Sequence, residues 1–131
     1  MSENISNLIA ASTTGDNSSV ANEATRTLQS RTRIFNHTFT FQDGMLVTWK
    51  PGMKHKQVPE YGQPVIVIQA LRDPVFDPEK SAGSMYFHEP LDLVCGEIVE
   101  DGFIEIYFDS RRMMPYDEWL KQQERFLDVD A

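Results

Sequence analysis

The sequence predicts a mainly β fold: a small barrel of about five strands, preceded by a flexible polar tail and followed by a C-terminal helix. Three observations carry this prediction. Short runs of alternating apolar residues, separated by proline and glycine, fill the middle of the chain. Serine, threonine and asparagine dominate its first part, and apolar residues at helical spacing follow Pro115.

Residues 1–33 are predicted to form the flexible tail. Residues 2–30 contain fourteen Ser, Thr or Asn side chains and few large hydrophobic ones. Such a segment buries too little apolar surface to offset the entropy lost on ordering. Val20, Ala24 and Leu28 are spaced four residues apart, so a short helix over 20–33 is an alternative for part of this segment.

Residues 34–115 are predicted to form the barrel. Asp101-Gly102 predicts a tight hairpin, because glycine accepts the positive φ of a type I′ turn. Strands are expected at 45–49, 64–71, 91–99 and 103–108, with a short closing strand or 3₁₀ turn at 111–114. We expect the alternating residues to supply the core: Val47, Trp49, Val65, Val67, Leu93, Ile104, Ile106 and Phe108, with Cys95 beside them.

Residues 116–131 are predicted to form an amphipathic helix with an acidic end. Asp117 is the expected N-cap, since its carboxylate can accept a hydrogen bond from the first turn. A helix this short is marginal in water unless it docks, either onto its own domain or onto a second copy as a homodimer. Its apolar stripe comprises Trp119, Leu120, Gln123, Phe126 and Leu127.

The order of short strands, long loops and one tight hairpin resembles the SH3-like small barrels over residues 41–115. Within that superfold, three segments resemble the β-subunit barrel of nitrile hydratases: VPEY at 58–61, PVFDPEKSAG at 74–83 and IYFDSR at 106–111. The resemblance implies a fold and no catalysis, because the metal-binding cysteine cluster belongs to the partner subunit of those enzymes.

Charge and cysteine content narrow the class of protein. The net charge is −8, and residues 71–131 hold six basic against fifteen acidic side chains. This field repels phosphate and disfavours nonspecific binding of nucleic acid. One cysteine excludes an intramolecular disulfide and any zinc site built on several cysteines. With neither an export signal nor a membrane span evident, we expect a soluble, cytoplasmic protein.

A basic loop after the first strand raises the possibility of nucleic-acid binding. Lys50, Lys54 and Lys56, with His55 among them, can contact phosphates. Lysines at a loop tip equally serve to keep it solvated, and the acidic second half of the chain favours that interpretation.

The connection predicted over residues 72–90 is more informative. Loops this long inside a small domain are uncommon and are usually functional or disordered. The aromatic residues in this one are typical of a binding surface, although they can also fold back to cap the barrel. We expect a protein partner to contact Phe76, Tyr86, Phe87, His88 and Glu89, together with the guanidinium pair Arg111 and Arg112.

These observations predict a non-catalytic interaction or accessory module that binds a protein partner through the 72–90 loop and an acidic surface. An acidic inhibitor or nucleic-acid mimic, of a kind found in phages and plasmids, is one alternative. A weak nucleic-acid binder using Lys54–Lys56 is the other. We expect no enzyme activity, cofactor or metal, because Ser110 has no base at a fixed spacing and no metal-ligand motif occurs.

Overall fold

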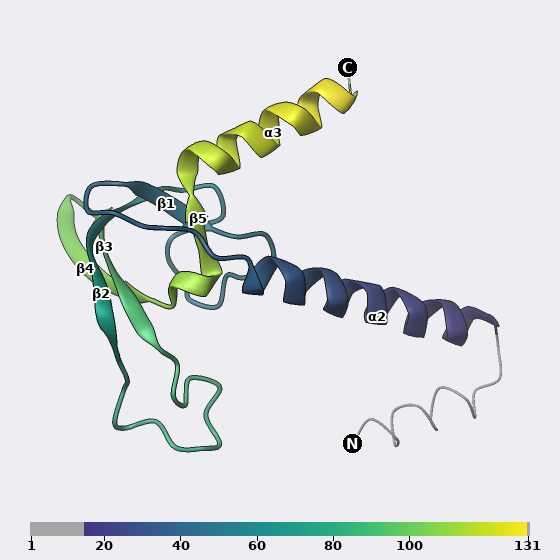
Figure 1. Ribbon diagram of the computed structural model, residues 1–131, viewed down its shortest axis with the longest axis horizontal. Helices are drawn as coiled ribbons and strands as arrows, with labels where there is room; N and C mark the ends of the chain where they lie inside the picture. The colour runs from purple at the N-terminus through teal and green to yellow at the C-terminus, as the bar shows by residue number, and fades with distance from the viewer. Residues whose placement is uncertain (1–14, 131) are drawn as a thin grey trace. The chain divides into compact units, whose positions relative to one another are not determined.

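The chain was studied as a computed structural model that describes residues 15–130, with side chains described over 19–125 (Figure 1). It divides into two units between Ile34 and Phe35. α2 (Gly15–Asn36) forms the described part of the first unit and ends just past this boundary. It runs through most of the predicted tail, so the helix is longer than the 20–33 alternative. Residues 1–14 of the predicted tail lie outside the described residues.

The second unit is built on one antiparallel sheet. Its strands are β1 (Leu46–Trp49), β2 (Val65–Val75), β3 (Leu91–Val99), β4 (Gly102–Phe108) and β5 (Met113–Pro115). They are arranged in the order β4-β3-β2-β1-β5 (Figure 1). A mainly β fold with a C-terminal helix is therefore confirmed, but the sheet does not close into the predicted barrel. Closure needs the two end strands to pair, and β5 has only three residues before the chain enters a helix.

The core lies on one face of this sheet, and eight fully buried residues form it. Trp49 is at its centre, with its ring edge-on to Phe108 at a centroid distance of 5.3 Å. Ile104 was predicted to belong to the core but is 39% exposed, and Ile106 is only partly buried against it. The buried cluster comprises Val47, Trp49, Val65, Val67, Leu93, Cys95, Phe108 and Met113.

The hairpin between β3 and β4 turns one residue earlier than the sequence suggested. Val99 pairs with Gly102, so the two central residues of the turn are Glu100 and Asp101. Their φ angles are 50° and 67°, and positive φ at both positions defines a type I′ turn. Gly102 is the first residue of β4 and does not supply the positive φ.

Two segments differ in extent from their predictions. β2 continues through Pro74 to Val75 with register shifts against β3, so the loop that follows covers only residues 76–90. The segment predicted as a strand or 3₁₀ turn contains both, a 3₁₀ helix η1 (Ser110–Arg112) followed by β5. Pro74 and Pro115 both lie at or next to the end of their strands, where a residue without a backbone N–H is tolerated.

α3 (Tyr116–Asp130) begins directly after β5 and packs on β1 and β5. The helix follows β5 with no intervening residue. Asp117 therefore lies inside the first turn of the helix, and the prediction that it is the N-cap is wrong. Trp119 stacks on Tyr116 and lies so close to Gly62 that a Cβ there would be 2.9 Å from the indole. The start of the helix thus docks within its own chain. Phe126 and Leu127 lie outside the residues with described side chains.

Three charged residues of the described chain are buried: Lys50, Glu97 and Asp109. Lys50 follows β1 and is 2% exposed, and its ammonium donates to the carbonyls of Phe35 (3.3 Å) and His37 (2.5 Å). Glu97 in β3 is 5% exposed, and its Oε2 has no hydrogen-bond partner among the described residues. Burial raises the pKa of Glu97 and lowers that of Lys50, against a smaller opposing effect of Asp109 on the lysine.

The opposite face of the hairpin carries an exposed aromatic ring. Phe103 is 63% exposed, and the tip of its ring lies over Gly96 in the neighbouring strand, where an added Cβ would be 2.1 Å from Cζ. Elsewhere on this hairpin Ile98 is 69% exposed. Within residues 15–130, no helix is both long and apolar enough to cross a membrane.

Candidate partner-binding loop

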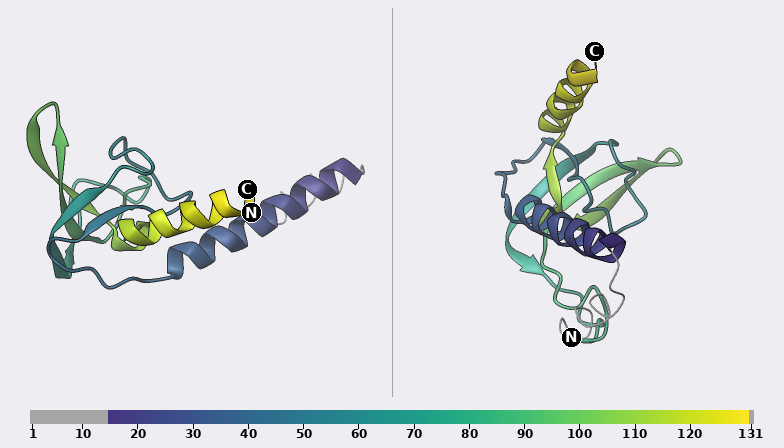
Figure 2. Two further views of the ribbon diagram at one scale, coloured as in Figure 1. Left: turned by 90° about the horizontal axis from the view of Figure 1, so that it is seen from above. Right: turned by 90° about the vertical axis from the view of Figure 1, so that its right-hand side faces the viewer.

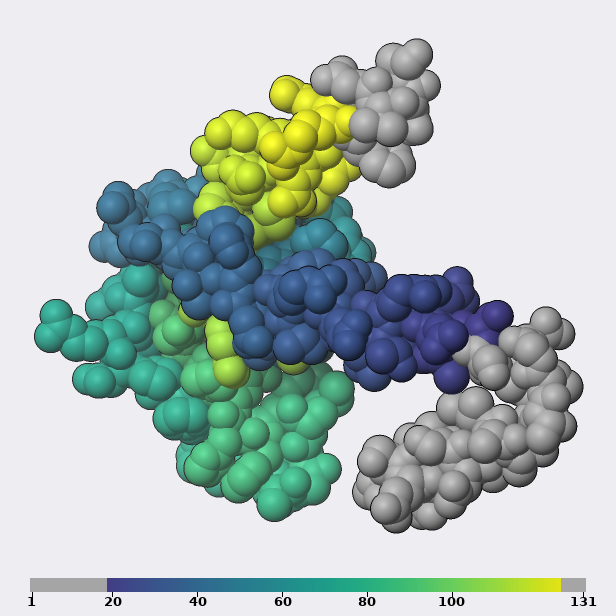
Figure 3. Space-filling model, turned by 45° about the vertical axis from the view of Figure 1, so that its right-hand side comes forward, coloured from purple at the N-terminus to yellow at the C-terminus, as the bar shows by residue number. Residues whose placement is uncertain are grey.

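The loop between β2 and β3, residues 76–90, is a chain of short turns. Four backbone hydrogen bonds join residues three apart, and the Ser84 hydroxyl and the Asp77 carboxylate accept two more from backbone N–H groups. In the space-filling view this segment forms a protrusion at the lower end of its unit (Figure 3). The loop therefore has a defined backbone without regular secondary structure.

The outer side of the loop is apolar and exposed. Phe76 is 44% exposed, Met85 78% and Phe87 42%. The imidazole of His88 lies 4.2 Å from the Phe87 ring and 5.4 Å from the Phe76 ring, centroid to centroid. His88 has a φ of 54°, a left-handed conformation that turns the chain directly after Phe87. Phe76, from the start of the loop, thus forms one exposed cluster with Phe87 and His88 near its end.

The inner side of the loop is anchored to the segment after β1. The Tyr86 hydroxyl donates to the carbonyl of His55 (3.2 Å), and Glu89 Oε2 accepts from His55 Nε2 (2.9 Å). The side chains of His55 and Glu89 are only 9% and 10% exposed. His55 in turn meets the ring of Trp49 edge-on, so the loop is connected directly to the core.

The His55–Glu89 contact sets the protonation of the imidazole. A carboxylate only accepts hydrogen bonds, so Nε2 of His55 carries the proton that faces Glu89. Nδ1 of His55 has no hydrogen-bond partner among the described residues. Burial lowers the pKa of His55 and Arg112 and Lys56 lower it further, against the raising effect of Glu89. The contact is therefore a hydrogen bond from a neutral histidine to a carboxylate.

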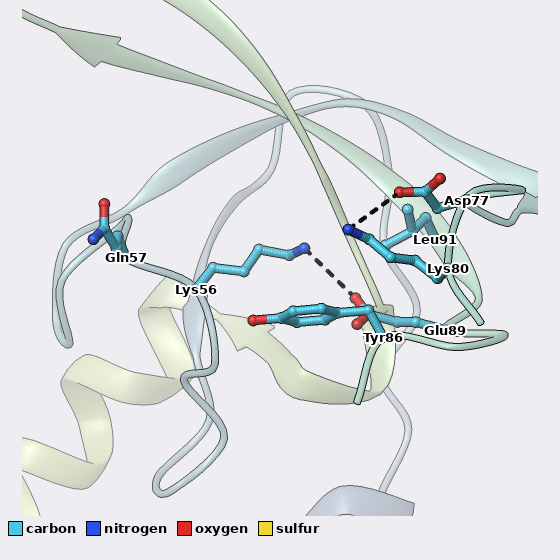
Figure 4. Close-up of a pocket in the computed structure, with 7 residues that line it drawn as sticks. All are labelled: Lys56, Gln57, Asp77, Lys80, Tyr86, Glu89 and Leu91. Atoms are coloured by element: carbon cyan, nitrogen blue, oxygen red, sulfur yellow. Dashed lines mark ion pairs between the residues drawn. The ribbon is translucent and has the colours of Figure 1, made fainter. Parts of the chain in front are cut away.

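A recess of about 410 Å³ opens beside this anchor (Figure 4). Lys56 and Lys80 extend over the Tyr86 ring from its two sides, with ammonium-to-centroid distances of 5.6 and 5.9 Å. Lys56 pairs with Glu89 at 3.6 Å and Lys80 with Asp77 at 3.9 Å. The recess is therefore charge-balanced, and Gln57 and Leu91 complete its lining.

Arg111 and Arg112, predicted to contact a partner, are engaged within the domain. Arg111 forms a two-pronged ion pair with Asp109, with Nη2 to Oδ2 at 2.7 Å, and this hydrogen bonding raises the pKa of Arg111. Arg112 donates from Nη1 to the carbonyl of Met53 (3.1 Å). Both guanidinium groups also lie over the ring of Phe35, at 4.6 and 5.5 Å. They brace the corner after β4 and do not join the aromatic cluster.

The three lysines of the nucleic-acid alternative do not form one surface. The ammonium of Lys50 is buried on backbone carbonyls and unavailable to phosphate. Lys56 is paired with Glu89, and the backbone N–H of Lys54 donates to the Tyr61 hydroxyl. A loop with one buried and one paired lysine makes a small phosphate footprint.

The described residues contain no cluster of three or more metal-ligating side chains. The Ser110 hydroxyl donates to Asp92 Oδ2 at 2.7 Å, and its N–H donates to the other oxygen. The Asp92 carboxylate holds Ser110 in the corner after β4. A nucleophilic serine is instead activated by an imidazole, and the Ser110 hydroxyl bonds to a carboxylate. His55 forms its contact with Glu89 at the loop instead.

The sequence did not reveal how the loop is anchored. The sequence places His55 in a basic loop and gives it no partner, yet it bonds to a residue 34 positions away. Met85, the most exposed of the loop's large apolar residues, was also missed as a contact residue. Tyr86 and Glu89, in contrast, were expected to face a partner and instead point inward. Neither a family model, nor a curated protein, nor a solved structure matches this chain.

Proposed function

We propose that the protein is a non-catalytic interaction module that binds a basic protein partner through the 76–90 loop. The observation that carries this proposal is the exposed cluster of Phe76, Phe87 and His88, with Met85 beside it. Aromatic and methionine side chains are the types enriched in the buried centres of protein interfaces. Rings held against one another supply contact area at little further cost in conformational entropy.

The way the loop is held supports the same function. Tyr86 and Glu89 lie on either side of the exposed residues Phe87 and His88, and both bond to His55. The inner side of the loop is therefore anchored while its outer side remains exposed. A surface that is ordered before binding loses less entropy when a partner arrives. The bonds of the inner side are therefore the reason why the outer side can serve as a recognition surface.

The charge of the surroundings favours a basic partner. Residues 71–131 carry six basic and fifteen acidic side chains, and Asp77 and Glu79 lie in the loop itself. Such a field speeds encounter with a positively charged surface and slows encounter with an acidic one. The apolar cluster then supplies the short-range contacts that hold the complex together.

The proposal is tested by panning a phage-displayed library of random peptides against the full chain. Selected peptides should combine Lys or Arg with apolar residues. The double variant Phe76→Ala with Phe87→Ala should raise the Kd of a selected peptide at least roughly 30-fold, about 2 kcal/mol, with an unchanged melting temperature. The matched control is Ile98→Ala with Phe103→Ala, two residues of the β3–β4 hairpin that are more exposed than Phe76 and Phe87, and it should bind as the wild type does.

Two results would contradict the proposal. The first is that selected peptides bind the Phe76/Phe87 variant as tightly as the wild type. The second is a tight, salt-sensitive complex with a labelled oligonucleotide that Lys54→Ala and Lys56→Ala abolish. That outcome would favour the nucleic-acid alternative, since the aromatic cluster plays no part in it.

A further inference from the structure

β4 is an edge strand with one neighbour. It ends the strand order of the sheet and pairs with β3 alone, in an unbroken antiparallel register from Val99–Gly102 to Leu93–Phe108. The hairpin of these two strands projects from the rest of its unit (Figure 2). A strand in this position has a second side on which its backbone groups have no strand partner.

The turn determines which backbone groups point outward. In a β-turn the N–H of the fourth residue, here Gly102, faces the carbonyl of the first, here Val99. Hydrogen-bonded and non-hydrogen-bonded pairs then alternate along an antiparallel ladder. The N–H and C=O groups of Phe103, Glu105 and Tyr107 are accordingly directed away from β3.

Devices that protect natural edge strands are missing from β4. Its sequence, GFIEIYF, contains no lysine, arginine or proline, and its pairing with β3 contains no bulge. Glu105 is its single charge, while Phe103, Ile104 and Tyr107 are 63%, 39% and 39% exposed. An edge of this composition presents both apolar side chains and free hydrogen-bonding groups to a further strand.

We infer that β4 pairs antiparallel with β4 of a second copy of this chain, joining two sheets across a two-fold axis. Charge complementarity along the strand supports a second copy as the occupant. Glu100 and Asp101 precede β4, and Arg111 and Arg112 follow it with Asp109. Antiparallel self-pairing brings the acidic turn of each copy to Arg111 and Arg112 of the other, where the Arg111 side chain is 43% exposed with Asp109 and Asp92 beside it.

The pairing register follows from the same residues. Centring the two-fold axis on Glu105 would place two carboxylates opposite each other, which is unfavourable. Centring it on Ile106 pairs Glu105 with Tyr107, so that outward-directed backbone groups meet on both strands. Ile106 then faces its own copy in a non-hydrogen-bonded pair, whose Cα atoms lie about 4.5 Å apart. This inference concerns a surface separate from the 76–90 loop and stands independently of the function proposed for it.

The first test is analytical ultracentrifugation of the full chain from about 1 µM to about 1 mM, a range that covers weak dimers. The wild type should change from monomer to dimer as its concentration rises. Glu105→Pro removes the outward N–H and leaves the β3 ladder intact, so it should fold and weaken the dimer at least tenfold. Glu105→Ala is the matched control, because it also removes the carboxylate but retains the N–H, and it should dimerise.

Amide hydrogen exchange of the wild type supplies a measurement that requires no variant. The amide protons of Phe103, Glu105 and Tyr107 should become protected as the concentration rises, while those of Ile104 and Ile106 are protected throughout. The register is tested with Ile106→Cys combined with Cys95→Ala, because Cys95 is the β3 partner of position 106 and would otherwise offer an intrachain disulfide. In oxidised glutathione this variant should give a disulfide-linked dimer, since the expected Cα separation suits the bond. Ile104→Cys, which would face Phe108 of the other copy, should not.

A wild type that remains monomeric across this range would overturn the inference, as would a dimer that Glu105→Pro leaves unchanged. The latter result would assign dimerisation to another surface, such as α3. Cross-linking through position 104 in place of 106 would overturn the register centred on Ile106.

Discussion

β1 and β4 occupy opposite situations in one sheet. β1 lies between β2 and β5, and three of its four residues, Val47 to Trp49, are buried. β4 has a neighbour on one side only, and Phe108 is the one residue of its seven that is buried. Both strands are rich in large apolar side chains. The difference between them shows that strand order, as much as residue type, decides whether an apolar side chain is covered.

The largest expected effect compares one aromatic residue from each strand. Trp49→Ala should lower the free energy of unfolding by about 3–5 kcal/mol, because the ring is fully buried and its Nε1 donates to the Pro59 carbonyl. Phe103→Ala should cost less than about 1 kcal/mol, since that ring is mostly exposed on Gly96. Urea denaturation measures both. Equal losses would show that the two strands do not differ as described.

The second prediction concerns the buried ammonium of Lys50, which follows β1. Lys50→Met keeps the length of the side chain but leaves the carbonyls of Phe35 and His37 without their donor. We expect a loss of about 1–3 kcal/mol in the free energy of unfolding at neutral pH. Lys121→Met, an exposed lysine of α3, is the control and should cost little. A stabilising Lys50→Met would mean that burying the ammonium costs more than its hydrogen bonds contribute.

The third prediction concerns Glu97 and pH. A carboxyl whose pKa is raised in the folded state binds its proton more tightly there than in the unfolded chain. The protonated carboxyl therefore stabilises the fold below about pH 4.5. This contribution is lost as the pH rises through the raised pKa. Glu97→Gln should therefore be more stable than the wild type at neutral pH, by about 1 kcal/mol.

The advantage of Glu97→Gln should disappear on acidification below the ordinary glutamate pKa. Melting temperatures over a pH series measure it. Glu105→Gln, at an exposed site of β4, is the matched control for the same exchange of side chains. An advantage of Glu97→Gln that does not depend on pH would show that proton binding is not its cause.

The smallest expected effect lies in the hairpin turn. Glu100 and Asp101 adopt positive φ, a conformation that costs an L-residue about 1 kcal/mol and that asparagine and glycine accept more easily. Replacing the pair by Asn-Gly should raise the free energy of unfolding by about 0.5–1 kcal/mol. The same pair placed at Asp101 and Gly102 should not stabilise the protein, and a gain there would return the turn to the position that the sequence suggested.

The sequence predicted elements well where a local signal was strong. Alternation located β1, β3 and β4, and apolar spacing located α3. Closure of the sheet could not be predicted, because it depends on whether the distant ends β4 and β5 meet, and no local pattern records this. The exposure of Ile104 also depends on which strands meet in the folded sheet, and the local alternation of β4 does not record this. The loop predicted over residues 72–90 was expected to present aromatic residues, but which of them face outward depends on His55, which contacts Glu89 from a separate loop.

Cys95 gives the chain a built-in reporter of opening. It is fully buried in the middle of β3, and burial raises its pKa to about 12. A thiol that is both inaccessible and protonated does not react with alkylating reagents. Labelling must therefore wait until the sheet around β3 separates, and its rate measures how often that happens. Because the sequence contains a single cysteine, every labelled molecule records the same event, and mass spectrometry can follow it without any engineered probe.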